Sequence, residues 1–203
     1  MTTWITSEAA LATHYGAPKR ASTVKVATVI TPQYRAYIEA APFCALASIG
    51  PEGLDCSPRG DDGAVASVVD ETTLALPDRR GNDRIDTLRN IVRDPRVSLM
   101  FLIPGSNTVI RVNGIAKITA DEDVCARFAK EGHAPRSVVF VTVGEVYFQC
   151  KRALMRARFW EGGFADPAAL PTPGEILEAL SHRDIDASTY DGAWAERAQK
   201  TMW

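Results

Sequence analysis

The sequence predicts a mainly β protein, a compact barrel of short strands with flanking helices. Six or seven short apolar or alternating segments are separated by turn residues, and two helical patterns interrupt them. Hairpin turns dominate, whereas a doubly wound parallel sheet requires strands that alternate regularly with helices. The length of 203 residues is close to that of one ordinary domain, so we expect a single domain.

The composition is that of an ordinary globular protein, with 46% hydrophobic and 24% charged residues. A net charge of −2 disfavours general attraction to nucleic-acid phosphates. No apolar run approaches the roughly 18 residues of a membrane span, and the N-terminus lacks the basic start and apolar run of a signal peptide. We therefore expect a cytoplasmic protein that binds neither nucleic acid nor membrane.

The cysteines and histidines are not spaced as metal ligands or redox dithiols are. No C-x-x-C pair occurs, and the three histidines lie far from the cysteines in sequence. We expect no metal site, and we expect the thiols to be reduced. The four cysteines are Cys44, Cys56, Cys125 and Cys150.

Residues 1–41 are expected to form an N-terminal arm with a short helix, followed by a second helix. Thr31 and Pro32 are typical of an N-cap and a first helical position, and Pro42 ends the helix. The barrel follows over residues 42–150. It opens with a hairpin over residues 43–58, which turns at Gly50-Pro51-Glu52-Gly53.

Further elements follow in the barrel region. Strands are expected at 64–69 and 73–76, and apolar residues at helical spacing predict a helix over 83–93. Residues 96–103 form a continuous apolar run, which predicts a strand buried on both faces or nearly so. Two more strands are expected at 108–118 and 137–148.

Between those last two strands, acidic residues at positions 121–123 open another short helix. Residues 151–203 form a C-terminal segment with helical pattern, and its tail could wrap the surface or a partner subunit.

The segment Asp78–Arg84 has the composition of a phosphate-binding turn. It lies between a predicted strand and a predicted helix and holds three arginines, a glycine and an asparagine. Free backbone N–H groups at a helix start, together with arginine side chains, bind phosphate well. The alternative is a solvated loop whose arginines pair with nearby aspartates, and composition favours neither.

Two other places could carry function. Residues Ser57–Asp61 end the hairpin's second strand, and the proline and glycine there predict an irregular stretch at a rim. A plain strand-ending turn is the alternative. Arg111 is a lone charge in an otherwise apolar strand, either an outward-facing residue of the alternation or a deliberately placed charge, and it is a candidate cofactor-binding residue.

The chain carries no recognisable acid–base or nucleophile machinery. It has no G-x-S-x-G motif, and His133 has no partner in sequence. Such a chain fits a protein whose chemistry belongs to a bound cofactor. No catalytic residue can be named from the sequence.

Taken together, four stretches of the sequence resemble the pyridoxamine 5′-phosphate oxidase-like, FMN-binding split-barrel family. They cover roughly residues 30–160, and the order of the motifs is more specific than any one of them. The resemblance is closest to a bacterial subgroup with the D-R-R-G-N stretch. The four stretches are FCALASIGPEGLDCSPRGD, LPDRRGNDRIDTLRNIVRDPRVSLMFLIPG, IRVNGIAKI and VYFQCKRALMRARFW.

The resemblance implies a six-stranded split β-barrel of the flavin reductase type and a homodimer with FMN at the subunit interface. It places one group of residues beside the flavin ring, namely Ser57, Pro58, Arg59 and Gly60. It places a second group on the FMN phosphate, namely Arg79, Arg80, Asn82 and Arg84. A third group can approach the flavin from the second subunit, namely Lys151, Arg156 and Trp160.

One departure limits what the resemblance implies. The R-x-V-L-L-K and R-L-H-D-R-type motifs of true pyridoxamine phosphate oxidases are absent from this chain. The resemblance therefore implies an FMN-dependent oxidoreductase acting on an unidentified small molecule. The alternatives are a non-catalytic carrier or sensor of flavin, heme or deazaflavin, and a structural dimer without a cofactor.

Overall fold

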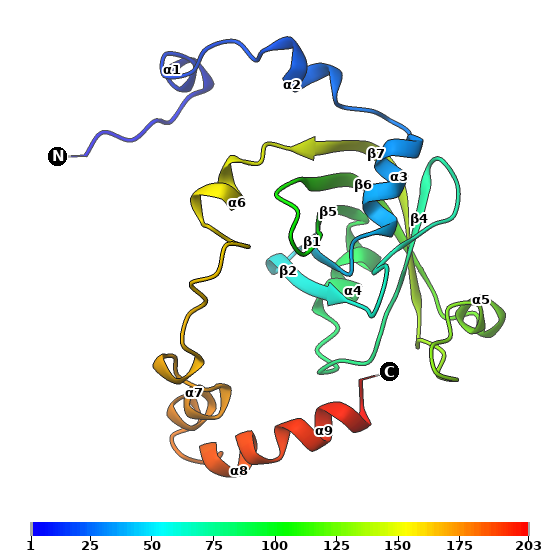
Figure 1. Cartoon of the computed structure of the whole chain (residues 1–203), viewed down its shortest axis with the longest axis vertical. Helices are drawn as coiled ribbons and strands as arrows, with labels where there is room; N and C mark the ends of the chain where they lie inside the picture. The colour runs from blue at the N-terminus through cyan, green and yellow to red at the C-terminus, as the bar shows by residue number, and fades with distance from the viewer. Residues whose placement is uncertain (1, 203) are drawn as a thin grey trace.

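The structure is a computed structural model that describes residues 2–202. Seven strands form one antiparallel sheet in the order β2-β1-β5-β6-β7-β4-β3 (Figure 1). Their bounds are β1 Phe43–Gly50, β2 Gly53–Gly60, β3 Ser67–Val68, β4 Thr73–Pro77, β5 Arg96–Leu102, β6 Val109–Thr119 and β7 Val138–Gln149.

Helices precede, interrupt and follow the sheet (Figure 1). Two of them, α3 Pro32–Glu39 and α4 Asp86–Arg93, pack on the sheet and bury Ile38 and Ile91 in its core. The other helices are α1 Glu8–Ala12, α2 Arg20–Val24, α5 Glu122–Ala126, α6 Arg152–Arg156, α7 Pro173–Leu180, α8 Ala187–Gly192 and α9 Trp194–Lys200. No helix among residues 2–202 is long and apolar enough to cross a membrane.

The main core lies on one face of the sheet, because the strands alternate, and a smaller cluster of Ala75, Cys125 and Val138 is buried on the other face. In β5, Val97, Leu99 and Phe101 are buried while Met100 is exposed. The expectation that this strand is buried on both faces is therefore wrong. Antiparallel sheets commonly leave part of one side open, as this sheet does at β5, and the apolar composition of β5 hid the alternation.

The expected six-stranded barrel is observed as an open sheet of seven strands. The end strands β2 and β3 do not pair with each other in the described part of the chain. The backbone between β2 and β3 bonds to the segment that follows α3 instead. Asp61 N donates to Pro42 O at 3.0 Å, and Val65 N donates to Ala41 O at 2.9 Å. These bonds tie the connection to the end of the α3 region. The strand observed in this region is β3, of two residues, where a strand over 64–69 was expected.

The prediction of an irregular stretch over Ser57–Asp61 is wrong for Ser57–Gly60, although the stretch does lie at the edge of the sheet. These residues belong to β2 and stay in register with β1, with Pro58 opposite Ala45. Proline is tolerated here because β2 is an edge strand, so the missing N–H costs no second ladder bond.

The helix expected from residue 83 starts three residues later. Asp83 and Ile85 adopt left-handed φ angles of 59° and 52°, which break the helical path before Asp86.

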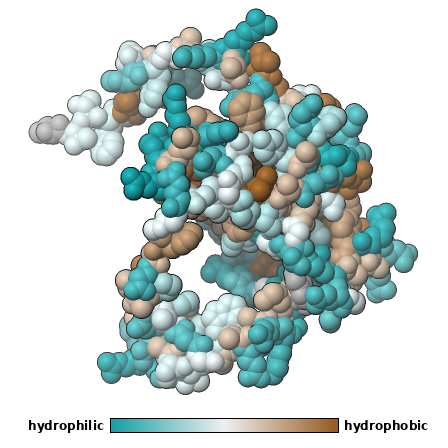
Figure 2. All heavy atoms as spheres, in the orientation of Figure 1, coloured by the Kyte–Doolittle hydropathy of each residue, from teal (hydrophilic) through white to brown (hydrophobic). Residues whose placement is uncertain are grey.

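The N-terminal segment, residues 2–29, and the C-terminal segment, residues 151–202, stand away from the sheet in Figure 1. The N-terminal segment touches it where Ala27 bridges to Val146 of β7. Figure 2 shows apolar side chains at the surface of both segments. The exposed large apolar residues there include Trp4, Tyr15, Val24, Phe164 and Leu180.

Candidate functional site

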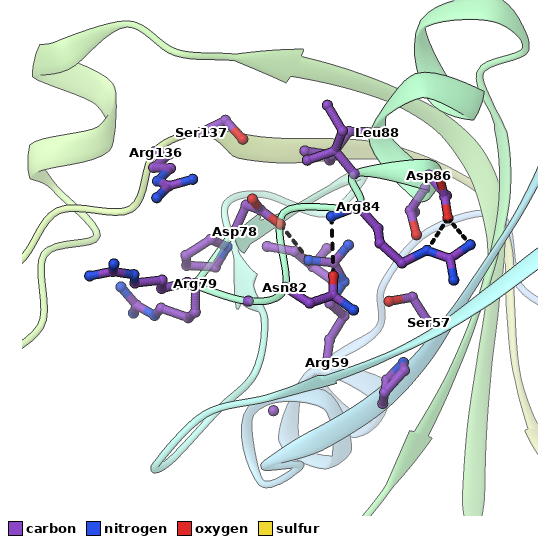
Figure 3. Close-up of a pocket in the computed structure, with 18 of the residues that line it drawn as sticks. Ser57, Arg59, Asp78, Arg79, Asn82, Arg84, Asp86, Leu88, Arg136 and Ser137 are labelled. Carbon is purple, nitrogen blue, oxygen red and sulfur yellow. Dashed lines mark hydrogen bonds and ion pairs between the residues drawn. The ribbon is translucent and has the colours of Figure 1, made fainter. Parts of the chain in front are cut away.

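A cleft of about 720 Å³ lies between the edge strand β2 and the loop that joins β4 to α4 (Figure 3). This volume is in the range of small-molecule and cofactor sites. Both segments singled out in the sequence line it, although they are more than fifteen residues apart in the chain. The predicted residues in its wall are Ser57, Pro58, Arg59, Gly60, Arg79, Arg80, Asn82 and Arg84.

The β2 wall alternates like any strand, so Asp55, Ser57 and Arg59 lie half-buried. Arg59 forms an ion pair with Asp78 of the opposite wall (Figure 3). The Nε atom of Arg59 is buried and has no hydrogen-bond partner. A buried donor left unpaired costs free energy, so the cleft offers a place for an acceptor atom of a ligand.

The opposite wall is a loop whose backbone is strained at two positions. Ile85, with its left-handed φ, is a β-branched residue in a region that such residues rarely adopt. Asn82 Oδ1 accepts a bond from the backbone N of Arg84 at 3.2 Å, which holds the turn between the strained positions. Strained backbone of this kind clusters at ligand-binding sites.

The loop presents positive charge to the cleft. Arg84 pairs with Asp86 at 2.7 Å, but its side chain is 76% exposed, so this pair is easily exchanged. Helix α4 starts at the cleft without a side-chain cap on its backbone N–H groups. Arginines and helix-start N–H groups together favour an anionic ligand group.

Arg79 has a different setting from the other arginines. Its Nε bonds to Asp61 at 2.9 Å, and its Nη1 donates to the carbonyl oxygen of Phe128 at 2.8 Å. Lys130 Nζ bonds to the same Asp61 carboxylate at 2.6 Å. Asp61 therefore ties the end of β2 to the loop after β4 and to the segment before β7.

The Asp61 carboxylate is buried, with only 6% of its side chain exposed. Burial by itself raises its pKa, but hydrogen bonds and positive charge from Lys130 and Arg79 outweigh burial and lower the pKa below its usual value. Asp61 therefore stays ionised at neutral pH and holds the two cations in place.

With this geometry established, comparison with known proteins gives the family. The family model described as pyridoxamine 5′-phosphate oxidase matches residues 30–150. The chain belongs to this family. The matched region contains both walls of the cleft and all seven strands. No curated protein matches the chain.

Several solved structures resemble the family domain at low identity. HupZ of Group A Streptococcus is 15% identical, over 59% of this chain and 93% of its own, with a TM-score of 0.48. A candidate pyridoxamine 5′-phosphate oxidase from Lactobacillus delbrueckii is 21% identical, over 60% and 95%, with a TM-score of 0.49. An FMN-binding protein from Syntrophomonas wolfei is 12% identical, over 57% and 83%, with a TM-score of 0.45.

Four residues that the resemblance or the sequence singled out lie outside the wall of the cleft: Arg111, Lys151, Arg156 and Trp160. Arg111 lies 5.3 Å from the ring centre of Tyr147 on the neighbouring strand β7. Trp160 Nε1 donates to the carbonyl oxygen of Ser106 in the β5–β6 turn of its own chain at 2.8 Å. Lys151 and Arg156 are exposed at α6.

Several residues that shape the cleft received no individual role from the sequence, although Asp61 ends the stretch Ser57–Asp61 that was singled out. Asp61 and Lys130 lie 69 positions apart, so no local motif could pair them. Arg136 reaches the cleft from the start of β7 and pairs with Asp83 at 2.7 Å. The one available signal was an excess of arginine and aspartate around the predicted turn.

The thiols and the histidines add no metal centre. The four cysteines are free. Among residues 2–202, no group of three His, Cys, Asp or Glu residues is placed to hold a metal ion. Burial raises the pKa of the Cys44 thiol to about 12 despite the nearby charge of Arg59, so this thiol is inert.

Proposed function

We propose that this member of the pyridoxamine 5′-phosphate oxidase family binds FMN in the cleft and is an FMN-dependent oxidoreductase for a small molecule. The single observation that carries the proposal is the cleft itself. One of its walls is an edge strand with a buried unpaired donor, and the other is an arginine-rich loop at a helix start. We also propose that it belongs to the subgroup with the D-R-R-G-N stretch.

The arginine-rich end of the cleft fits a phosphate group. Arg80, Asn82 and Arg84 line it, and Arg136 reaches it from the start of β7. A phosphate that accepted bonds from Arg84 would replace the exposed Asp86 carboxylate with a stronger, doubly charged partner. Arg79 would support this end indirectly, because its guanidinium group already bonds to Asp61 and Phe128.

The β2 end of the cleft fits a flat ring with polar edges. Pro58, Val65 and Leu76 supply apolar surface, and Arg59 Nε is a donor in need of an acceptor. Ser57 and Gly60 would lie beside the same ring. When bound, FMN supplies hydride or electron transfer, and the chain's own residues bind and orient it. The substrate is not specified by these residues.

We further propose a homodimer in which the two subunits share each FMN site. The cleft is bounded by an edge strand, so a single subunit leaves it open on one side. Both terminal segments carry exposed apolar side chains, among them Trp4 and Phe164. A second copy would cover such side chains, which are enriched at subunit interfaces. Lys151, Arg156 and Trp160 would then lie close to the partner's flavin.

The visible spectrum of the purified protein tests the cofactor. We expect flavin absorbance, or its appearance after incubation with FMN and removal of the excess. A colourless protein that takes up no FMN would contradict the proposal, and a Soret band would indicate heme instead.

Reduction separates an enzyme from a carrier. We expect a reduced nicotinamide cofactor to bleach the bound flavin and air to restore its colour. A protein that holds FMN but cannot be reduced by any physiological donor would be a carrier or sensor, which is the alternative function.

A further inference from the structure

A second, smaller cavity adjoins the cleft on the far side of the β4–α4 loop. Its volume is about 330 Å³. It shares Asp78, Arg79, Arg80 and Arg136 with the larger cleft, so these residues form a common wall between the two. The residues that line only the smaller cavity are Gly132, His133, Ala134 and Pro135.

The walls of this cavity are held in place by bonds within the chain. Lys130 and His133 exchange two backbone hydrogen bonds, of 2.8 and 3.0 Å, across a tight turn in which Gly132 has a φ of 82°. Lys130 is in turn bonded to Asp61, which also holds Arg79. The two walls of the cavity are therefore held by one buried group, the Asp61 carboxylate.

The cavity carries an excess of positive charge. Three arginines line it against one carboxylate, that of Asp78, which is paired with Arg59. Arg79 is itself paired with Asp61, so the excess charge lies on Arg80 and Arg136. The pair between Arg136 and Asp83 is exposed, at 62% and 64% of the two side chains, so it holds Arg136 weakly. Arg80 is exposed between the two cavities. A small cavity with this lining is suited to an oxyanion, because arginine forks match its geometry.

We propose that this cavity, bounded by the β4–α4 loop and the 130–136 segment, is a second oxyanion subsite that receives a phosphate group. The proposal rests on the proposed function, because Arg80 and Arg136 would lie between this phosphate group and the phosphate of the flavin. The group can come from either of two sources: the second phosphate of a flavin dinucleotide, or a phosphate carried by the separate substrate.

The variants Ala134→Glu and Ala134→Gln test the subsite. Ala134 lines the smaller cavity only, and it is exposed, so either side chain can be added without disturbing the core. The two replacements have the same size and differ in charge. Circular dichroism checks that both fold as the wild type does.

Calorimetry with inorganic pyrophosphate, added to FMN-saturated protein, tests the separate-substrate source. We expect wild type and Ala134→Gln to bind pyrophosphate with similar affinity, and Ala134→Glu to bind it about tenfold more weakly or worse, because like charges repel. Affinities for FMN and FAD in the same three proteins test the dinucleotide source. If the second phosphate of a flavin dinucleotide occupies the subsite, wild type and Ala134→Gln bind FAD more tightly than FMN. Ala134→Glu then binds the two flavins equally well.

The outcomes separate the two sources and the two proposals. The subsite is wrong if FMN-saturated protein binds no pyrophosphate and FAD has no advantage over FMN, or if the Glu and Gln variants behave alike. If FMN itself does not bind, the proposed function fails. Pyrophosphate titration of the ligand-free variants then still shows whether charge at position 134 controls an anion site.

Discussion

Asp61 and Arg79 form a 2.9 Å ion pair that joins the end of the edge strand β2 to the loop after β4. The same carboxylate accepts a bond from Lys130, so three distant segments meet at one buried charge. This cluster sets the separation of the two cleft walls and supports the smaller cavity behind them. Arg79 therefore acts mainly as a positioning residue.

Replacing Asp61 with asparagine is expected to destabilise the fold. The substitution leaves two cations without their shared counter-charge, and loss of charge-assisted hydrogen bonds costs about 1.5–3 kcal/mol. Urea denaturation measures the change in the free energy of unfolding. Asp62→Asn is the matched control: its side chain is 88% exposed and lies 3.8 Å from Lys130, so we expect almost no change. Equal losses in the two variants would show that the buried cluster contributes nothing special.

The stabilisation by Asp61 depends on pH in a defined direction. The folded protein lowers the pKa of this carboxyl below the ordinary value of 3.8, so the contribution is fully present above that value. It is lost as the pH falls through the lower folded-state pKa. The difference in unfolding free energy between wild type and Asp61→Asn should thus stay constant near neutral pH and shrink in acid. Denaturation curves from pH 7 down to pH 3 measure this, and a difference that grew in acid would contradict it.

Arg84→Ala is expected to weaken FMN binding tenfold to a hundredfold, since a charge-assisted bond to phosphate is worth roughly 1.5–3 kcal/mol. Folding should change little, because the Arg84–Asp86 pair is exposed. Fluorescence titration with FMN measures the affinity. Riboflavin, which lacks the phosphate, should bind wild type and variant with equal affinity. An equal loss of affinity for both ligands would show that Arg84 does not bind the phosphate.

Arg93→Ala is the matched control for that series. Arg93 lies at the far end of the same helix, α4, and pairs with Glu52 outside the cleft. We expect this variant to bind FMN as wild type does. A loss equal to that of Arg84→Ala would indicate a general effect of net charge.

Removal of the C-terminal segment tests the shared site. We expect a chain that ends at residue 150 to form fewer dimers and to retain less flavin than the full chain, as measured by light scattering and absorbance. A chain that ends at residue 161 keeps the bond between Trp160 and Ser106 and isolates the contribution of α7 to α9. A full-length monomer at micromolar concentration that still holds one FMN per chain would overturn the dimer.

Gly114→Ala is expected to destabilise the sheet by about 2 kcal/mol or more, since overpacking a tight contact typically costs 1–3 kcal/mol. A Cβ at this position would lie 2.2 Å from the backbone oxygen of Thr142, at the irregularity in the β6–β7 register. Gly144→Ala is the control, because its Cβ would lie 3.4 Å from Asn113 O. Thermal unfolding compares the two, and similar melting temperatures would contradict the close approach.

Much of the secondary structure could be predicted from the sequence, because its signals are local. Thr31 caps α3 as expected, accepting a bond from Tyr34 N, and Pro32 occupies the first helical turn. The hairpin of β1 and β2 turns at Gly53, whose φ of 121° suits glycine. The arginine-rich turn was also visible as a segment of unusual composition between a strand and a helix.

The sequence alone therefore determined most of the strands and helices, though not the bounds of β2, β3 and α4, and which two segments carry the polar residues of the candidate site. Only the tertiary structure decided that β2 and the β4–α4 loop face each other across a cleft. It also showed that Arg79 bonds to Asp61 while Arg84 stays exposed. The reason is that periodicity and capping act over a few residues, whereas the Asp61 cluster joins positions from 61 to 130 and forms only when the chain is folded.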